Sequence, residues 1–124
     1  MAQTFLILGA LFAAVGVGAG AFGAHALRGR LSAEMLAVFE TGVRYHLIHA
    51  LALVAVGLAA TRWASPAVGL AGWLFCAGVI LFSGSLYLLA LGGPRVLGAI
   101  TPIGGAAFIA GWLILAYGVS LGPT

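Results

Sequence analysis

The sequence FETGVRYHLIHALALVAVGLAA, at residues 39–60, decides the fold, because a polar stretch runs directly into an apolar one. The first half carries two of the three histidines of the chain, one of its five arginines and one of its two carboxylates, whereas Leu51–Ala60 has no polar side chain. This arrangement is typical of a membrane helix with one polar end. Ionisable groups at the mouth of such a helix are costly, so they need a structural or functional reason.

Composition extends this interpretation to the whole chain. Of its 124 residues, 64% are hydrophobic and only 6% are charged, and the mean hydropathy is +1.23. Soluble domains contain about 25% charged residues, and a helix that crosses the hydrocarbon slab needs roughly 20 apolar residues. Four such helices use almost the full length. We therefore predict an all-α, integral membrane four-helix bundle, with residues 1–124 forming a single transmembrane domain and no soluble domain.

The apolar runs and their breakers place the helices. We expect four spans, at about residues 3–26, 42–61, 67–91 and 97–121. Ser32 is a candidate N-cap and Glu34 follows in the first turn, where the helix dipole favours a carboxylate. These signals predict a short interfacial helix before the second span, continuing into it. Small residues at helical spacing in the first and fourth spans indicate close packing of helix backbones.

The charges indicate topology. The formal charge is +3, from dispersed arginines and no lysine, and no basic run is present, so we expect no nucleic-acid partner. Arg28, Arg30, Arg44 and Arg95 fall on one side of the predicted bundle and Arg62 on the other. The positive-inside rule then places both termini on the non-cytosolic side. The single cysteine, Cys76, excludes an internal disulfide.

The polar residues of all four spans fall on the side that carries most arginines, which predicts a cluster in the cytosol-facing leaflet. Within it, Glu40 and Arg44 are four residues apart and share a helix face in the favourable order, and Tyr45 and His49 share another. The other leaflet offers almost only apolar side chains. The candidate ligand-binding or interhelical residues are His25, Glu40, Arg44, Tyr45, His49, Ser83, Ser85, Tyr87 and Thr101.

Metal, haem and nucleophile chemistry are the alternatives for this cluster. Three imidazoles can bind zinc and paired histidines can hold haem iron, and His46 and His49 are three residues apart. However, the third and fourth spans supply no histidine or carboxylate. Ser83 and Ser85 sit in no nucleophile-elbow context. We therefore predict no catalytic residue, no metal site and no cofactor, with a histidine-based metal or haem protein as a less favoured alternative.

Four blocks of sequence carry a family resemblance: residues 20–25, 39–50, 82–87 and 101–105. With these blocks the chain resembles the domain-of-unknown-function 423 family of small four-helix membrane proteins, which includes bacterial proteins of the YgdD and YwdK type and the mitochondrial transmembrane protein 256. The resemblance implies a multi-pass protein of the bacterial plasma (inner) membrane, and it implies no activity. Position 46 is often glutamine in the family pattern, which argues against a scheme that requires His46 as a ligand.

These observations favour a non-enzymatic membrane protein that binds a lipid-like molecule or a partner helix through the polar cluster. The partners expected are membrane lipid, a second copy of the chain or another membrane protein. The alternative is an oligomeric transporter or channel for a small solute or a proton. A complete path across the membrane would need polar stations at every depth, and the sequence supplies them only halfway.

Overall fold

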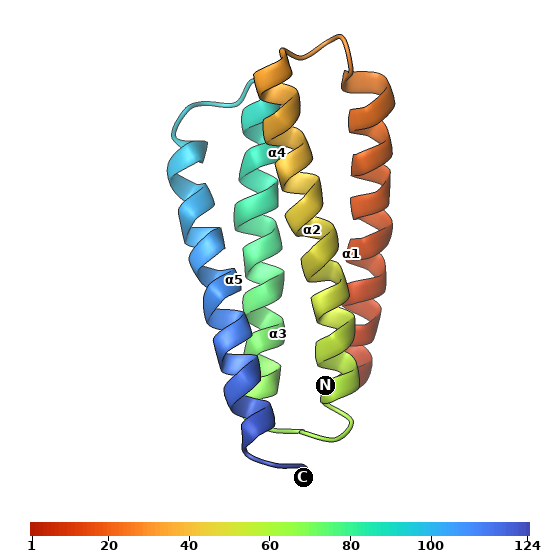
Figure 1. Cartoon of the computed structure of the whole chain (residues 1–124), viewed down its shortest axis with the longest axis vertical. Coiled ribbons are helices and arrows are strands. Elements are labelled where there is room, and N and C mark those ends of the chain that lie inside the picture. Colours follow the sequence, from red (N-terminus) through yellow and green to blue (C-terminus); the bar gives the residue numbers. More distant parts are fainter.

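The computed structural model describes all 124 residues, which form four long helical rods and no strand. The rods are α1 (Ala2–Phe22) continued by the π-helical turn η1 (Gly23–Leu27); α2 (Ala33–Ala59); α3 (Pro66–Gly78), the π-helical turn η2 (Val79–Ser83) and α4 (Gly84–Ala90) in series; and α5 (Leu97–Ser120). Both termini lie at one end of the bundle, and the α1–α2 and α4–α5 connections lie at the other (Figure 1). The predicted all-α four-helix fold is confirmed.

Each rod is long and apolar enough to cross a membrane. The four contain 26, 27, 25 and 24 residues, and at a rise of about 1.5 Å per residue each exceeds the roughly 30 Å of hydrocarbon. Many large apolar side chains stay exposed on their outer faces, including Leu51, Leu113 and Ile109. Lipid tails rather than water suit such a surface.

The stretch before the second span is the start of α2 and not a separate helix. Ser32 caps it as predicted, with its Oγ accepting a hydrogen bond from the Met35 amide at 3.2 Å. No break follows at Gly42, where the chain stays helical and buried. The helix is continuous because no proline interrupts it and Gly42 lies against the ring of Tyr87 on the third rod.

Local sequence sets the turns. Gly29 and Gly92 have φ values of 85° and 99°, a conformation that glycine adopts at no steric cost and that ends the helices before them. At the opposite end, Ser65 accepts a hydrogen bond from the Val68 amide at 3.3 Å, and Pro66 occupies the first helical turn, where its missing N–H is not needed. These turns hold consecutive rods antiparallel.

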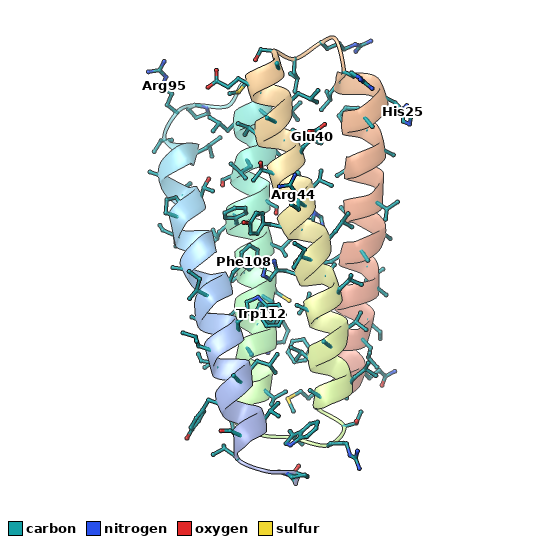
Figure 2. The ribbon with its side chains drawn as sticks, in the orientation of Figure 1. His25, Glu40, Arg44, Arg95, Phe108 and Trp112 are labelled. Atoms are coloured by element: carbon teal, nitrogen blue, oxygen red, sulfur yellow. The ribbon has the colours of Figure 1, made fainter.

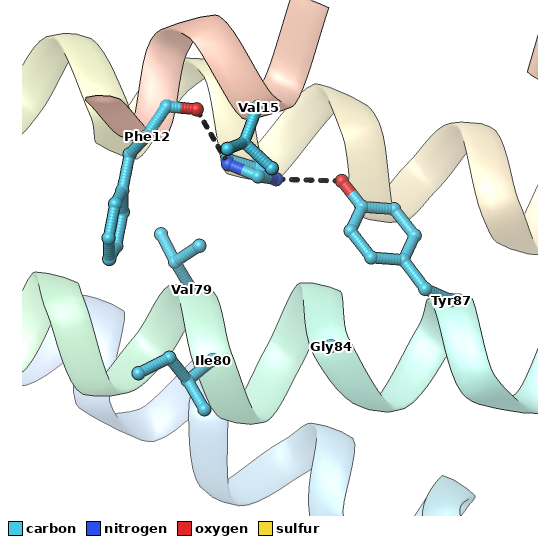
Figure 3. A pocket seen from close by; sticks show the side chains of 7 residues that line it. Phe12, Val15, Val79, Ile80, Gly84 and Tyr87 are labelled. Carbon is cyan, nitrogen blue, oxygen red and sulfur yellow. Dashed lines mark hydrogen bonds between the residues drawn. The ribbon is translucent and has the colours of Figure 1, made fainter. Parts of the chain in front are cut away.

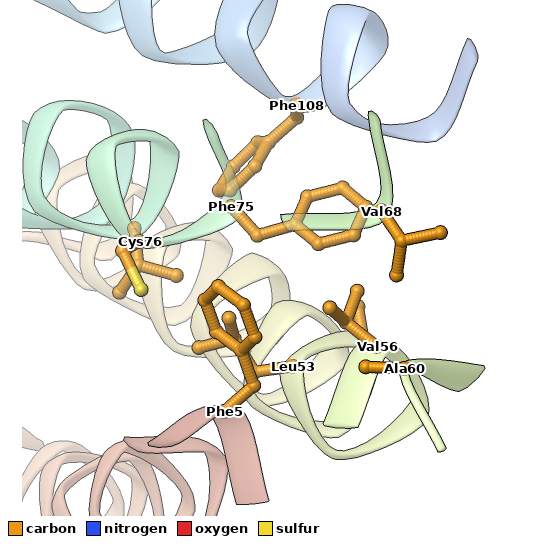
Figure 4. Packing of buried hydrophobic residues seen from close by; sticks show 10 residues of the cluster. Phe5, Leu53, Val56, Ala60, Val68, Phe75, Cys76 and Phe108 are labelled. Atoms are coloured by element: carbon orange, nitrogen blue, oxygen red, sulfur yellow. The ribbon is translucent and has the colours of Figure 1, made fainter. Parts of the chain in front are cut away.

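The packing order of the rods determines where openings can form. α1 packs chiefly on α2, α2 packs on the third rod, and α5 packs on the opposite side of the third rod. The main hydrophobic core fills the half of the bundle nearest the termini, where Phe5, Leu53 and Phe75 meet (Figure 4). Cys76 belongs to this core as a buried thiol. In the other half a smaller buried cluster of Leu27, Phe39 and Ala90 joins η1, α2 and α4.

Close approach of α1 to α2 depends on small residues. A Cβ atom at Gly9 would lie 2.8 Å from the Val54 amide nitrogen and 2.9 Å from the Ala50 carbonyl oxygen. Both are backbone atoms and cannot move aside without separating the helices. Gly18 on the same helix is exposed and has no atom within 4 Å of such a Cβ.

We therefore predict opposite effects for two alanine substitutions on α1. Gly9→Ala should lower the free energy of unfolding by about 1–3 kcal/mol, the usual cost of overpacking. Gly18→Ala should leave it unchanged or raise it by up to about 1 kcal/mol through helix propensity. Reversible unfolding in mixed micelles measures both, and equal effects at the two positions would contradict the packing described.

Candidate functional site

His46 joins three rods at the middle of the bundle. It stands midway between the ends of α2 and is 4% exposed. Its Nε2 donates a hydrogen bond to the Phe12 carbonyl oxygen of α1 at 2.8 Å, and its Nδ1 accepts one from the Tyr87 hydroxyl of α4 at 2.8 Å (Figure 3). Because a carbonyl can only accept, the proton of the neutral ring lies on Nε2.

His49 joins α2 to α5 one turn further along. It is 3% exposed; its Nδ1 donates to the Tyr45 carbonyl oxygen at 2.8 Å, and its Nε2 accepts from the Trp112 indole N–H at 3.0 Å. The imidazole also stacks on Phe108, with ring centroids 3.5 Å apart and an angle of 9°. The two histidines are therefore opposite tautomers, each fixed by its partners.

These partners leave neither histidine free to bind a metal. Both ring nitrogens of His46 and His49 are occupied by protein groups, and no group of three His, Cys, Asp or Glu side chains could hold a metal ion. An indole N–H can only donate, so His49 keeps its bond to Trp112 only while it is neutral. Both rings therefore act as neutral groups that join helices through hydrogen bonds.

The predicted hydroxyl groups form a second set of bridges. Ser83 is fully buried, and its Oγ donates to the Gly42 carbonyl oxygen of α2 at 2.7 Å. Ser85 shares a hydrogen bond of 2.6 Å with Thr101 of α5 and also donates to the Phe82 carbonyl oxygen at 2.9 Å. No buried side-chain polar atom in the chain lacks a partner, as an apolar surrounding requires.

The remaining predicted residues lie on the surface. His25 on η1 and Glu40 and Arg44 on α2 are exposed and take no part in these bridges (Figure 2). Glu40 and Arg44 share a face as predicted from their spacing, but no ion pair joins them. Tyr45 is 39% exposed beside His49. The nine predicted residues thus do not converge on one cavity.

Sequence reasoning missed His46 and Trp112. His46 falls on the buried stripe of α2, in helical register with Phe39, Gly42 and Leu53, so the 3.6-residue period was a usable signal. For Trp112 no local signal exists, because its partner is 63 residues away.

Two lateral grooves flank the third rod, and each has a histidine in its lining. The groove between α1 and the third rod, called groove A, has a volume of about 310 Å³ and is lined by Phe12, Val15, His46, Val79, Ile80, Gly84 and Tyr87. The groove between α2 and α5, called groove B, has a volume of about 350 Å³ and is lined by Tyr45, His49, Phe82, Gly105, Phe108, Ile109 and Trp112. The turn η2 contributes to both.

Comparison with known proteins gives one consistent result. The family model described as "Protein of unknown function (DUF423)" matches residues 19–105. A UPF0382 membrane protein of Staphylococcus haemolyticus is 54% identical over 113 residues, covering 91% of this chain and 92% of the relative. The UPF0382 membrane protein YwdK of Bacillus subtilis is 49% identical over 114 residues, covering 91% and 93%. No solved structure matches.

We predict that the Tyr87 hydroxyl stabilises the bundle through His46. Tyr87→Phe should lower the free energy of unfolding by about 0.5–1.5 kcal/mol, the range of hydrogen bonds between membrane helices. Tyr117→Phe is the matched control, because Tyr117 is 60% exposed and its hydroxyl has no hydrogen bond. Unfolding in mixed micelles compares the two, and an equal loss for Tyr117→Phe would refute the assigned role of Tyr87.

Proposed function

Because the chain belongs to the DUF423 family, whose relatives are named membrane proteins, we propose that it is a non-enzymatic binding protein of the bacterial plasma membrane. Its ligand is a lipid-like molecule whose apolar chain lies in groove A. The observation that carries this proposal is an open groove, about 310 Å³ in volume, at the middle of a membrane bundle.

The lining of groove A suits a hydrocarbon chain. Phe12, Val15, Val79 and Ile80 present apolar surface, and Gly84 leaves room where a side chain would otherwise stand. The polar atoms of His46 and Tyr87 form hydrogen bonds with each other and with the backbone, so they need no hydrogen-bond partner from a molecule in the groove. Hydrocarbon is the solvent on this side of the bundle, and an acyl chain is its ordinary component.

Charge at the nearest end of the bundle supports an anionic lipid. Arg28 and Arg30 lie in the α1–α2 connection and Arg95 in the α4–α5 connection, at the same end (Figures 1 and 2). Val15 lies about 18 Å from Leu27 along α1 and η1, close to the roughly 15 Å of hydrocarbon that one leaflet provides. A phosphate held by Arg28 and Arg30, in the connection that follows α1 and η1, would therefore place its acyl chain in the groove.

The same arginines support an orientation. By the positive-inside rule they favour the α1–α2 and α4–α5 connections in the cytosol and both termini outside. Groove A then opens towards the cytosol-facing leaflet. Labelling of a cysteine introduced at Thr124, in a Cys76→Ala background, checks this from outside intact cells; protection from an impermeant reagent would reverse the orientation.

The apolar core argues against a transport path within one chain. Beyond His49 the bundle is filled by residues such as Leu53, Val56 and Phe75, all fully buried. A conducted ion or proton would meet no polar side chain there. A path between several copies is a separate arrangement, and no feature of the bundle favours it over lipid binding.

The test replaces Gly84, whose Cβ position has no atom within 4 Å although it lines groove A. Gly84→Leu should fill the groove without distorting the helices and lower the amount of co-purified phospholipid several-fold. Gly18→Leu is the matched control, because Gly18 is equally unhindered but lies outside the groove. Native mass spectrometry of both variants, released from mild detergent, measures bound lipid.

The outcomes separate the possible occupants. Loss of lipid in Gly84→Leu alone supports the proposal, and preference for anionic lipid that disappears with Arg28→Gln and Arg30→Gln supports the headgroup assignment. Equal lipid retention by both glycine variants overturns the proposal that a lipid chain lies in groove A. Loss of a co-purified membrane protein or of a second copy, with lipid unchanged, would assign the groove to a partner helix instead.

A further inference from the structure

We infer that groove B is a second binding site, for a planar membrane-soluble ring with a carbonyl acceptor, the chemistry of a quinone headgroup. This inference is independent of the lipid proposed for groove A. Groove B lies across the third rod from groove A, between α2 and α5, and has a volume of about 350 Å³. Aromatic rings from α2, η2 and α5 make most of its wall.

The rings of groove B form a connected set. The centroid of Tyr45 lies 4.8 Å from that of Phe82, and Phe82 lies 5.5 Å from Phe108. Tyr45 and Phe108 are nearly parallel, with an angle of 16°. Flat π-surfaces of this kind pack best against another flat ring, in offset or edge-on contact. Groove A has fewer rings, since three of its seven lining residues carry one, against five of seven in groove B.

The wall is held rigid by the His49 bridge. The hydrogen bond from the Trp112 indole to His49 fixes one ring, and stacking on His49 at 3.5 Å fixes Phe108. A site whose side chains are already ordered loses little entropy when a ligand enters. The same bridge therefore joins α2 to α5 and sets the shape of the groove.

A free hydrogen-bond donor distinguishes groove B from groove A. The hydroxyl of Tyr45 has no partner within the chain, because the only side-chain-linked hydrogen bond at this residue is the one its carbonyl accepts from His49. Tyr45 is partly exposed where it lines the groove. In hydrocarbon a free hydroxyl is stabilised when it donates a hydrogen bond to a carbonyl acceptor. An acyl chain cannot supply this acceptor within the bilayer core.

Gly105 makes room for the ring. A Cβ at this position would meet only Phe82, at 3.8 Å, which is ordinary contact. A larger side chain there would therefore occupy the groove without forcing the helices apart. Gly98 on the same helix is exposed and has no neighbour within 4 Å of its Cβ position, so it is a matched site outside the groove.

The experiment uses Trp112 as a fluorescent reporter in the full chain, in lipid nanodiscs. Trp63→Phe and Trp73→Phe leave Trp112 as the only tryptophan of the three. Titration with a decyl-substituted benzoquinone should quench Trp112 fluorescence along a saturable, single-site curve. A chain that keeps only Trp73, which packs edge-on to Phe5 away from the groove, reports collisional quenching in the bilayer.

Three variants test the assignment. Gly105→Leu should weaken the saturable phase at least ten-fold, Gly98→Leu should leave it unchanged, and Tyr45→Phe should weaken it several-fold while preserving the aromatic wall. Equal, non-saturating quenching of Trp112 and Trp73 would overturn the inference. So would unchanged affinity in Tyr45→Phe and Gly105→Leu, or displacement of the quinone by a simple fatty acyl probe at equal concentration. Because Tyr45→Phe removes only a hydroxyl that has no hydrogen-bond partner in the chain, it keeps the test decisive if Gly105→Leu fails to fold.

Discussion

A polar group inside hydrocarbon must find its hydrogen-bond partner within the protein, and in this bundle that constraint falls on His46 and His49. Each ring presents one donor and one acceptor when neutral. In each ring the N–H donates to a backbone carbonyl. The other nitrogen accepts from the Tyr87 hydroxyl in His46 and from the Trp112 indole in His49. Three of the four partner groups, those of Phe12, Tyr87 and Trp112, belong to other rods, and the fourth is the Tyr45 carbonyl one turn away on α2. The two rings therefore fix how α1, α4 and α5 lie around α2.

The two bridges also determine where the bundle is open. His46 makes its hydrogen bonds to α1 and α4, and His49 makes its hydrogen bonds to α2 and α5, so each histidine lines one groove. The π-helical turn η2 separates the grooves: Val79 faces the first and Phe82 the second. Such turns insert an extra residue and shift the faces of a helix, and they often occur at functional sites. This short segment thus presents aliphatic side chains to one groove and an aromatic ring to the other.

Much of the architecture follows from local sequence, whereas the composition of the sites does not. Hydropathy and length predict four helices, Ser32 predicts a helix cap, and the small residues of the first span predict close packing. The one-sided distribution of polar residues was visible too. The hydrogen-bond partners of these residues could not be predicted, because Trp112 and Tyr87 meet the histidines only through tertiary packing. The i,i+4 spacing of Glu40 and Arg44 was also a poor guide, since their shared face points outward.

Nitrogen NMR of the ring nitrogens of His46 and His49, in protein labelled with ¹⁵N-histidine and held in lipid bilayers, tests the central claim most directly. Two neutral rings of opposite tautomer are expected near neutral pH, protonated on Nε2 at His46 and on Nδ1 at His49. Assignment follows from His46→Gln and His49→Gln. Identical tautomers, rapid exchange between tautomers, or a charged imidazolium at either position would contradict the bridges on which both grooves depend.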